Sequence, residues 1–295
     1  MQLLSKNTLT DVYHLPPSGS PDANVLKVAK PEADFAFWES RFNHEYQISQ
    51  SLSAQINNRV RPTLEKTSWK GRPALLLKYI PGISLKEHIN LSDKHAPDLN
   101  TNLKIAMNAA LVLAELHQEG YLHLSLSPEH ILIHPQSLNV TLISLGQVQA
   151  LNAPSKKASL ASDESLDFRY IAPEQIGHMG NNVAQYSDLY SLGIVIYELF
   201  TGYLPFVAED QLELLYAHQT LTPPDPQQFL PNEPEGMASL AKIILTLLAK
   251  DPVERYQSAE SLVHDLKLCW QTYQQEQKLP ELIPAAWDRQ EHFEL

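Results

Sequence analysis

The stretch at residues 121–146 restricts the fold of this chain more than any other part of it. It contains a polar turn, a short β run at 131–133, a second turn, and another β run at 140–143. Pro128 in the first turn and Pro135 in the second disfavour a helix here, because proline lacks the backbone N–H and clashes with the preceding helical turn. The pattern therefore predicts two short strands joined by a turn and preceded by a polar loop.

This stretch resembles the catalytic segment of eukaryotic-type protein kinases. The family pattern is His-Arg-Asp-Leu-Lys-Pro-Glu-Asn, then a hairpin, then Asp-Phe-Gly. The positions that keep the family's scaffold residues are His123, Leu126, Pro128, Glu129 and Gly146. The positions that carry chemistry in the family are all changed: Ser125 replaces the base Asp, Ser127 the phosphate-binding Lys, His130 the metal-binding Asn and Ser144 the metal-binding Asp.

These replacements remove what phosphoryl transfer requires. A serine hydroxyl at 125 cannot accept the substrate proton as a carboxylate does, and that contribution is worth roughly 10²–10⁴-fold in rate. Ser144 removes a carboxylate ligand from a hard cation, and the imidazole of His130 suits softer metals. The resemblance therefore implies a pseudokinase with no intact catalytic residue.

Composition limits the class of protein. The formal net charge of −12 disfavours nucleic acid and anionic membrane surfaces as partners. The single cysteine, Cys269, fits a reducing compartment. The N-terminus carries no apolar signal core, and the longest apolar run, Leu192–Phe200, is about half of what a membrane span needs. A cytoplasmic protein is the expectation.

The first eighty residues predict a β-rich lobe with one helix. Strand signals lie at 9–13, at 25–29 and on both sides of a turn within 61–78, and apolar spacing predicts a helix over 34–53. The kinase resemblance would place a glycine-rich phosphate loop at 5–10. That segment contains no glycine, so its side chains would hinder close approach of the backbone to a phosphate.

The resemblance also implies the remains of a nucleotide site. Lys27 aligns with the strand lysine of the family, with Lys30 as the alternative, and Glu45 aligns with the helix glutamate that pairs with it. Backbone groups of Lys78 and Ile80 would hold the edge of a base. No cofactor is certain from this pattern, and ATP bound without magnesium is the alternative.

The rest of the chain predicts a larger helical lobe. An amphipathic helix over 101–119 ends at Gly120, and a nearly all-apolar helix covers 194–200. By resemblance, Asp188 caps that helix and bonds the loop near His123, while Glu174 pairs with Arg255. The expected fold is α+β and bilobal: an N-lobe of five strands and one helix at 1–80, a helical C-lobe at 81–275, and a linker toward a following domain at 276–295.

A closer likeness points to the kinase-like N-terminal domains of large bacterial multidomain signalling proteins. The residues that carry it are Pro173–Gly180 and the tail Ala286–Leu295. The leading hypothesis is a regulatory or protein-interaction module in signalling, with a protein partner or adjacent domains as its target. The alternatives are a weak or atypical protein kinase and a metal-independent ATP sensor. No metal site is expected, because His130 and His134 flank a β run and would not converge.

Overall fold

The computed structural model describes residues 1–6, 9–16, 24–52, 56, 59–92, 98–153, 166–176, 182–230 and 234–290. The chain forms two compact units, and each is considered by itself. Unit 1 contains Met1–Gly82 and Thr141–Val148, and unit 2 contains Ile83–Val140 and Gln149–Leu295. The predicted α+β class with a β-rich lobe and a helical lobe is confirmed.

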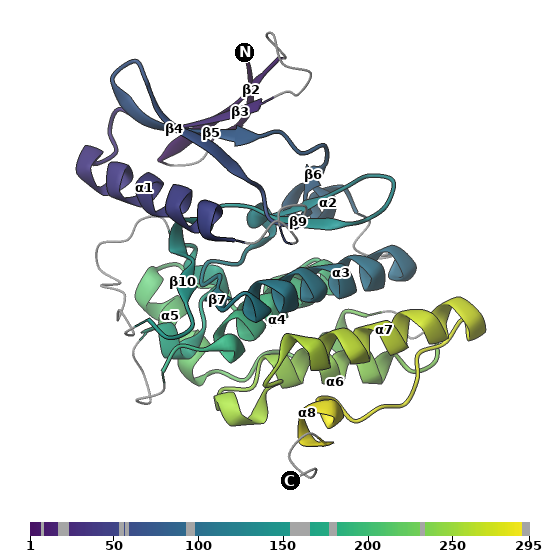
Figure 1. Ribbon diagram of the computed structural model, residues 1–295. Helices are drawn as coiled ribbons and strands as arrows, with labels where there is room; N and C mark the ends of the chain where they lie inside the picture. The colour runs from purple at the N-terminus through teal and green to yellow at the C-terminus, as the bar shows by residue number, and fades with distance from the viewer. Residues whose placement is uncertain are drawn as a thin grey trace. The chain divides into compact units, whose positions relative to one another are not determined.

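Unit 1 is built on an antiparallel sheet of five strands in the order β1-β2-β3-β5-β4 (Figure 1). The strands are β1 (Gln2–Lys6), β2 (Thr10–Leu15), β3 (Asn24–Ala29), β4 (Thr63–Trp69) and β5 (Arg72–Lys78). The register places Lys27 of β3 opposite Val12 of β2 and Leu75 of β5. Within the glycine-free segment at 5–10, residues 7 and 8 lie outside the described part of the chain.

Helix α1 (Phe35–Ser51) lies along the sheet of unit 1, as Figure 1 shows. It begins where the Asp34 carboxylate accepts a hydrogen bond of 2.7 Å from the Phe37 N–H, a typical N-cap. Trp38 and Phe42 pack against the buried strand residues Val25 and Leu75. Burial of these apolar side chains fixes which face of α1 is turned toward the sheet.

A segment distant in sequence completes unit 1. Strand β9 (Val140–Leu142) leads into a 3₁₀ turn, η3 (Leu145–Gln147). The Arg61 N–H donates to the Leu142 carbonyl at 2.9 Å, and the Leu142 N–H donates to the Arg59 carbonyl at 2.8 Å. Sequence order alone assigns all of 81–275 to the second lobe. These backbone bonds instead hold 141–148 to the first.

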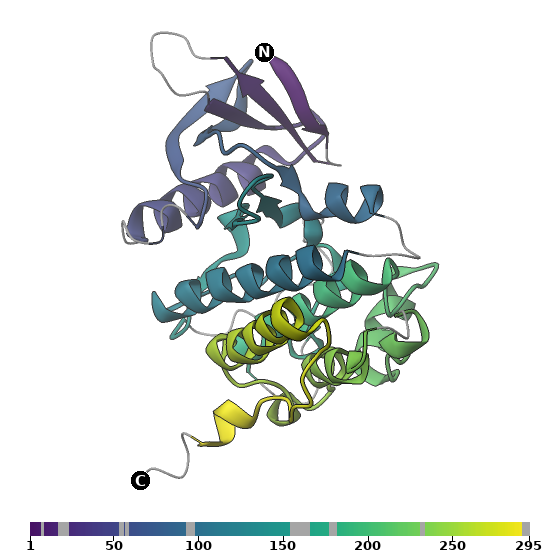
Figure 2. The ribbon, with the colours of Figure 1, turned by 90° about the vertical axis from the view of Figure 1, so that its right-hand side faces the viewer.

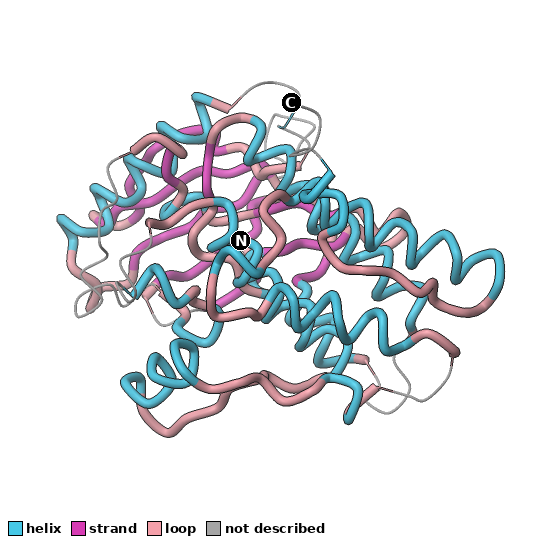
Figure 3. The backbone as a smooth tube through the Cα atoms, turned by 90° about the horizontal axis from the view of Figure 1, so that it is seen from below, coloured by secondary structure: helices cyan, strands magenta, loops and turns pink. Residues whose placement is uncertain are grey.

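Unit 2 is mainly helical (Figure 3). Its helices are α2 (Leu85–Leu91), α3 (Leu99–Gln118), α4 (Gln185–Thr201), α5 (Gln211–Thr220), α6 (Met237–Leu247), α7 (Ala259–Glu276) and α8 (Ala286–Gln290). Its short strands are β6 (Ile83–Ser84), β7 (Tyr121–Leu122), β8 (Ile131–Ile133) and β10 (Gln149–Ala150). Its 3₁₀ turns are η2 (Pro128–His130), η4 (Phe168–Tyr170), η5 (Pro173–Ile176), η6 (Pro226–Gln228) and η7 (Pro252–Glu254). Helices α3 and α7 run side by side (Figure 2).

The core of unit 2 forms around α4, which is buried from Ser187 to Thr201. This confirms the prediction of a helix that is apolar on nearly all faces. The predicted helix over 101–119 is α3, which begins two residues earlier because Asp98 caps it. Gly120 follows its end with a φ of 84°, a conformation that glycine adopts without steric cost.

The C-terminal residues are packed on unit 2 as far as they are described, which differs from the predicted linker over 276–295. The Leu279 N–H donates to the Glu235 carbonyl at 2.8 Å. The Asp288 carboxylate accepts bonds from the Gln257 N–H at 2.9 Å and the Ser258 hydroxyl at 2.6 Å. A sequence rich in glutamine and charge gives no local signal of these distant partners. Whether a further domain follows stays a prediction.

None of the helices within the described residues combines the length and apolarity that a membrane span requires.

Candidate functional site

The predicted site residues fall into two groups, one in each unit. Unit 1 contains the residues aligned with the nucleotide-holding part of a kinase: Lys27, Glu45, Lys78, Ile80, Ser144 and Gly146. Unit 2 contains those aligned with the catalytic loop and its scaffold: His123, Ser125, Ser127, His130, Glu174, Asp188 and Arg255.

Lys27 and Glu45 form a buried ion pair in unit 1. The Lys27 Nζ lies 2.9 Å from the Glu45 Oε2, and the two residues are only 8% and 2% exposed. The position of Lys27 in β3 and of Glu45 on the buried side of α1 brings them together. Lys27, rather than the alternative Lys30, is therefore the lysine at the pair.

The charges around this pair shift the pKa of both partners. Burial lowers the pKa of Lys27, although the attraction of Glu45 acts in the opposite direction. Burial by itself would raise the pKa of Glu45, but the positive charges of Lys27, Arg61 and Arg41 outweigh it and lower that pKa. Glu45 is thus held as a carboxylate in a site with excess positive charge.

Arg61 contributes to that excess, although no sequence motif had singled it out. The residue is only 8% exposed and lies just before β4, which begins at Thr63. Burial lowers the pKa of its guanidinium to about 10 against the attraction of Glu45, so it stays charged at neutral pH. Among the described residues, no hydrogen-bond or ion-pair partner reaches this guanidinium; only the Arg61 backbone N–H is bonded.

Ser144 keeps an unusual backbone conformation without the carboxylate that the family has there. Its φ of 67° and ψ of 68° lie in the left-handed region, which costs a non-glycine residue on the order of 1 kcal/mol. Gly146 lies against α1, and a Cβ there would come 2.9 Å from the Arg41 Nε, so the Arg41 side chain would have to move. Ser144 therefore holds a left-handed conformation, and Gly146 lies in close contact with the Arg41 side chain.

The Lys78 backbone offers only part of what the sequence suggested. Its N–H already donates to the Pro62 carbonyl at 3.1 Å, which continues the pairing of β4 and β5. The Lys78 N–H is therefore not available to a base. The prediction that Lys78 and Ile80 hold a base now concerns only the Lys78 carbonyl and the backbone of Ile80.

In unit 2, Asp188 organises the loop at 123–130, which contains Ser125, Ser127 and His130. Its fully buried carboxylate accepts bonds from the His123 N–H at 2.8 Å, the Leu124 N–H at 2.7 Å and the His117 Nε2 at 2.9 Å. These bonds hold Leu124 at a φ of 58°. The predicted bond from Asp188 to the loop near His123 is confirmed.

The prediction that Asp188 caps the helix is wrong. Ala184 is the N-cap of α4, and the Ser187 hydroxyl accepts its N–H at 3.2 Å. Asp188 lies one turn inside the helix, where its carboxylate is directed to the loop instead of the helix end.

The residues that differ from the kinase pattern make hydrogen bonds within the loop. The His130 Nδ1 donates to the Ser125 carbonyl at 2.6 Å, and the His130 N–H donates to the Ser127 carbonyl at 3.0 Å. The Ser125 hydroxyl lies 3.5 Å from the His123 Nδ1, at the limit of a hydrogen bond. His130 thus uses one ring nitrogen to fix the loop, and Ser125 presents a neutral hydroxyl where a kinase has its base.

Glu174 and Arg255 form a buried bidentate pair. The two guanidinium nitrogens lie 2.8 and 3.1 Å from the two carboxylate oxygens. Arg255 also donates to the carbonyls of Tyr186, Ala249 and Lys250. Every part of the guanidinium is therefore occupied, and the pair joins η5 to the turn after η7.

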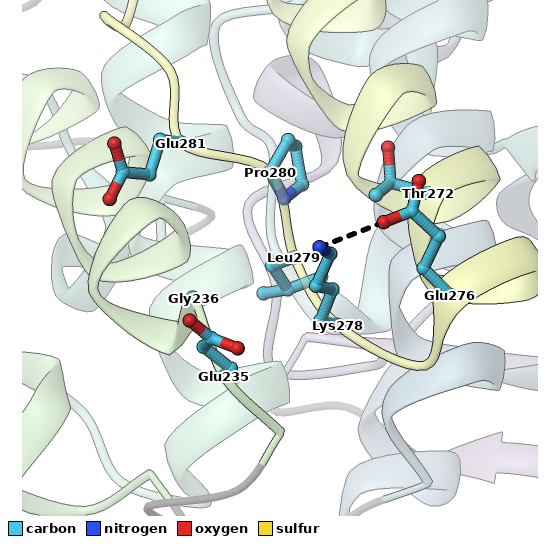
Figure 4. Close-up of a pocket in the computed structure, with 8 residues that line it drawn as sticks. All are labelled: Glu235, Gly236, Thr272, Glu276, Lys278, Leu279, Pro280 and Glu281. Carbon is cyan, nitrogen blue, oxygen red and sulfur yellow. Dashed lines mark ion pairs between the residues drawn. The ribbon is translucent and has the colours of Figure 1, made fainter.

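No metal-binding cluster occurs within the described residues, where three or more His, Cys, Asp or Glu side chains would have to gather. A pocket of about 480 Å³ lies elsewhere in unit 2, between the ends of α6 and α7 (Figure 4). Glu235, Glu276 and Glu281 line it, and Lys278 pairs with Glu276 at 2.9 Å. This acidic lining suits an anionic ligand poorly, and none of the predicted site residues lies there.

Two further residues escaped sequence reasoning for a common reason. His117, which bonds Asp188, lies on the buried face of α3. From sequence alone, a histidine at such a position would be interpreted as a core residue without a specific partner. Gln175 bridges the Ala172 N–H at 3.1 Å and the Leu124 carbonyl at 3.0 Å, and so ties η5 to the loop. In the sequence, His117 lies among apolar residues and Gln175 lies beside a kinase-like motif. Neither context identifies the residue that the side chain bonds.

Comparison with known proteins places these features in a family. The protein kinase domain family matches residues 9–266. The serine/threonine-protein kinase PrkC of Bacillus subtilis is 28% identical over 225 residues, which cover 73% of this chain and 33% of PrkC. The serine/threonine-protein kinase PknB of Mycobacterium leprae is 30% identical over 228 residues, which cover 77% of this chain and 35% of PknB. The chain thus spans about a third of the length of these curated relatives.

Solved structures show the same fold. A double mutant of the Mycobacterium tuberculosis PknI kinase domain superposes with a TM-score of 0.67 at 23% identity, covering 90% of this chain and 92% of that one. The PknI kinase domain itself gives a TM-score of 0.64 at 22% identity. At this identity the likeness concerns the fold alone.

Proposed function

Because this chain belongs to the protein kinase domain family, we propose that it is a pseudokinase: a regulatory or protein-interaction module of bacterial signalling that performs no ordinary phosphoryl transfer. One contrast carries the proposal. The contacts that shape a kinase scaffold are kept, among them the bonds of Asp188 and the Glu174–Arg255 pair. The side chains that would act on phosphate or metal are replaced.

The replacements act on different requirements of the reaction. Phosphoryl transfer depends on positioning and on metal ions that neutralise the developing charge. Ser144 provides no carboxylate for a metal, and the His130 Nδ1 is committed to the Ser125 carbonyl. Ser125 provides no base. Because these losses fall on separate steps, restoring one residue alone would not restore turnover.

The partner that we propose is a protein or an adjacent domain of a longer signalling protein, since the part matched by this chain is only about a third of its curated relatives. Nucleic acid is disfavoured by the net charge of −12.

A phosphate-transfer assay tests the main proposal. The purified chain is incubated with radiolabelled ATP, magnesium or manganese, and a general protein substrate, beside the triple variant Ser125→Asp, His130→Asn, Ser144→Asp. We expect no incorporation by the unchanged chain above a no-protein blank. Incorporation that is abolished by Lys27→Met would contradict the pseudokinase proposal. Any gain in the triple variant would locate the defect at the three replaced positions.

A weak or atypical phosphotransferase is the second candidate, and one observation favours it. Asp167 lines the same small pocket as Ser125, so a carboxylate lies near the degenerate position. However, Arg169 donates to both of its oxygens, at 2.8 and 2.5 Å. Both carboxylate oxygens of Asp167 are thus already bonded within the chain. If the unchanged chain incorporates phosphate, Asp167→Asn should abolish it.

A further inference from the structure

Helix α5 lies at the edge of unit 2 (Figure 1), and its exposed face is apolar. Leu212 is 78% exposed and Tyr216 is 59% exposed, in a helix of only 10 residues. Residues four apart on a helix lie on the same side, so these two side chains form one apolar face. Val207 before the helix and Leu221 after it are exposed as well, at 82% and 49%.

Helix α7 shows that such a face is not general in unit 2. It has 18 residues, and its exposed side chains are mainly glutamine and charged residues. Leu268, at 39% exposure, is the one large apolar side chain that it exposes. Single exposed apolar residues are normal on protein surfaces, whereas adjacent ones mark places where another molecule binds. The face of α5 therefore differs from an ordinary helix surface.

Both ends of α5 are fixed. At its start the Asp210 carboxylate accepts the Glu213 N–H at 2.8 Å. At its end the Lys250 Nζ donates to the His218 carbonyl at 2.7 Å and to the Ala217 carbonyl at 3.3 Å. A surface that is already ordered loses less conformational entropy when a partner binds. The face formed by Leu212 and Tyr216 is thus suited to binding without rearrangement.

The charge beside this face has one sign. Three acidic residues lie at its N-terminal end: Glu209, Asp210 and Glu213. The sequence contains neither lysine nor arginine from 170 to 241. The cations that other elements bring close to α5 are engaged, since Lys250 bonds the carbonyls at its end and Arg169 of η4 bonds both oxygens of Asp167. The face therefore combines apolar side chains with negative charge that is not neutralised by neighbouring lysines.

We propose that the α5 face docks a cationic amphipathic helix of a partner protein. The apolar side chains of such a helix cover Leu212 and Tyr216, and its lysines or arginines lie against the acidic residues at the start of α5. Tyrosine is among the residues that contribute most to binding at protein interfaces. This inference rests on the proposed function, because it names the docking face and the partner chemistry of an interaction module.

The same charge disfavours two other occupants. A symmetric contact with a second copy of this chain would bring the same acidic residues together, and like charges that meet at an interface oppose association. An anionic membrane surface would be repelled in the same way. A cationic partner is favoured by both the apolar and the charged part of the face.

The test is equilibrium binding to the purified full chain, measured by fluorescence anisotropy. The probe is a labelled amphipathic helical peptide composed of leucine and lysine, and the control peptide has glutamate in place of every lysine. The variants are Leu212→Gln, Tyr216→Gln and Glu213→Gln. Leu91→Gln is the matched control, because Leu91 is a leucine at the end of α2 with a similar exposure of 74%.

We expect the cationic peptide to bind, and Leu212→Gln and Tyr216→Gln each to weaken binding about tenfold. Glu213→Gln should weaken it about threefold and reduce its dependence on salt. Leu91→Gln should change the Kd less than about twofold, and the glutamate peptide should bind at least about tenfold more weakly. A photoreactive group on the peptide should label residues within 207–221.

Several results would overturn the proposal. They are no binding of the cationic peptide, an unchanged Kd in both Leu212→Gln and Tyr216→Gln, equal binding of the glutamate peptide, and labelling only outside 207–221. A dimer seen in sedimentation and abolished by Leu212→Gln would assign the face to a second copy instead. Binding to phosphatidylserine vesicles that is lost in the same variant would assign it to a membrane.

The thermal midpoint of each variant without peptide checks its folding. If one of the two apolar variants does not fold, the other and Glu213→Gln give the answer. Failure of this proposal is distinguishable from failure of the proposed function, because turnover in the phosphate-transfer assay would contradict the pseudokinase proposal alone, whereas only the peptide data bear on α5.

Discussion

Two buried arginines, one in each unit, show opposite ways of treating a buried charge. Arg255 in unit 2 is 2% exposed and donates to both oxygens of Glu174 and to three backbone carbonyls. Arg61 in unit 1 is 8% exposed, and within the described residues its guanidinium has no such partners. The first is a completed scaffold contact, whereas the second makes no side-chain hydrogen bond to the described residues.

The comparison teaches that burial of a charge does not by itself indicate structural stabilisation. A fully bonded ion pair fixes one arrangement of the chain, and breaking it leaves a buried charge behind. A buried cation without bonded partners lowers stability, because the hydration that it loses is not replaced by hydrogen bonds. Variants that remove each arginine should therefore act in opposite directions.

The largest effect is expected from Arg255→Met. Removal of this arginine leaves Glu174 charged and buried, which should lower the free energy of unfolding by about 3–5 kcal/mol. Urea denaturation measures this change. The half-buried pair of Arg169 and Asp167 is the control, since Arg169→Met should cost about 0–1 kcal/mol. A similar small cost for Arg255→Met would mean that the two arginines do not differ as described.

The next largest effect is the response of unit 2 to acid. His218 is fully buried, and burial together with the charge of Lys250 lowers its pKa to about 4 from 6.5. Between these two values the unfolded chain binds a proton that the folded chain does not, so stability falls as pH decreases from about 6.5 to 4. The loss should approach about 3 kcal/mol.

Urea midpoints recorded from pH 7 to pH 4 measure this acid response. His218→Gln should flatten the profile in this range, since glutamine does not titrate. If the variant keeps the full slope, the acid response belongs to other groups.

A somewhat smaller effect is expected from Asp188→Asn. The amide retains one acceptor oxygen but loses the charge that strengthens the bonds to the His123 and Leu124 N–H groups. The free energy of unfolding should fall by about 2–3 kcal/mol. Hydrogen exchange at these two amides should accelerate. Ser125→Ala serves as the control and should leave both amides protected, because Ser125 is not a partner of Asp188.

The smallest effect has the opposite sign. Arg61→Met should raise the free energy of unfolding by about 1 kcal/mol, because it removes a desolvated charge and keeps an apolar side chain of similar length. Lys66→Met should stay within about 0.5 kcal/mol of the parent. Thermal or urea unfolding measures both. A loss of several kcal/mol in Arg61→Met would show that this guanidinium is part of the scaffold, and the comparison with Arg255 would fail.

Much of the fold was accessible from local pattern. Patches of β-prone residues separated by turn signals indicated strands in unit 1. Helical spacing of apolar residues indicated α1 and α3, because that spacing reflects burial of one face. The all-apolar run in α4 indicated a central helix for the same reason. The order of kinase-like motifs pointed to the α+β bilobal class and selected Lys27, Glu45 and Asp188 as residues worth placing.

The sequence by itself determined which side chains are present at each motif position, and hence that Ser125, Ser127, His130 and Ser144 cannot act as carboxylate, lysine or asparagine. The tertiary structure alone decided what those and other side chains contact. It turned His130 toward the Ser125 carbonyl, joined 141–148 to unit 1, packed Asp288 against α7, and buried Arg61 beside an ion pair that was already formed. These outcomes depend on residues far apart in the chain, and local periodicity contains no information about such distant partners.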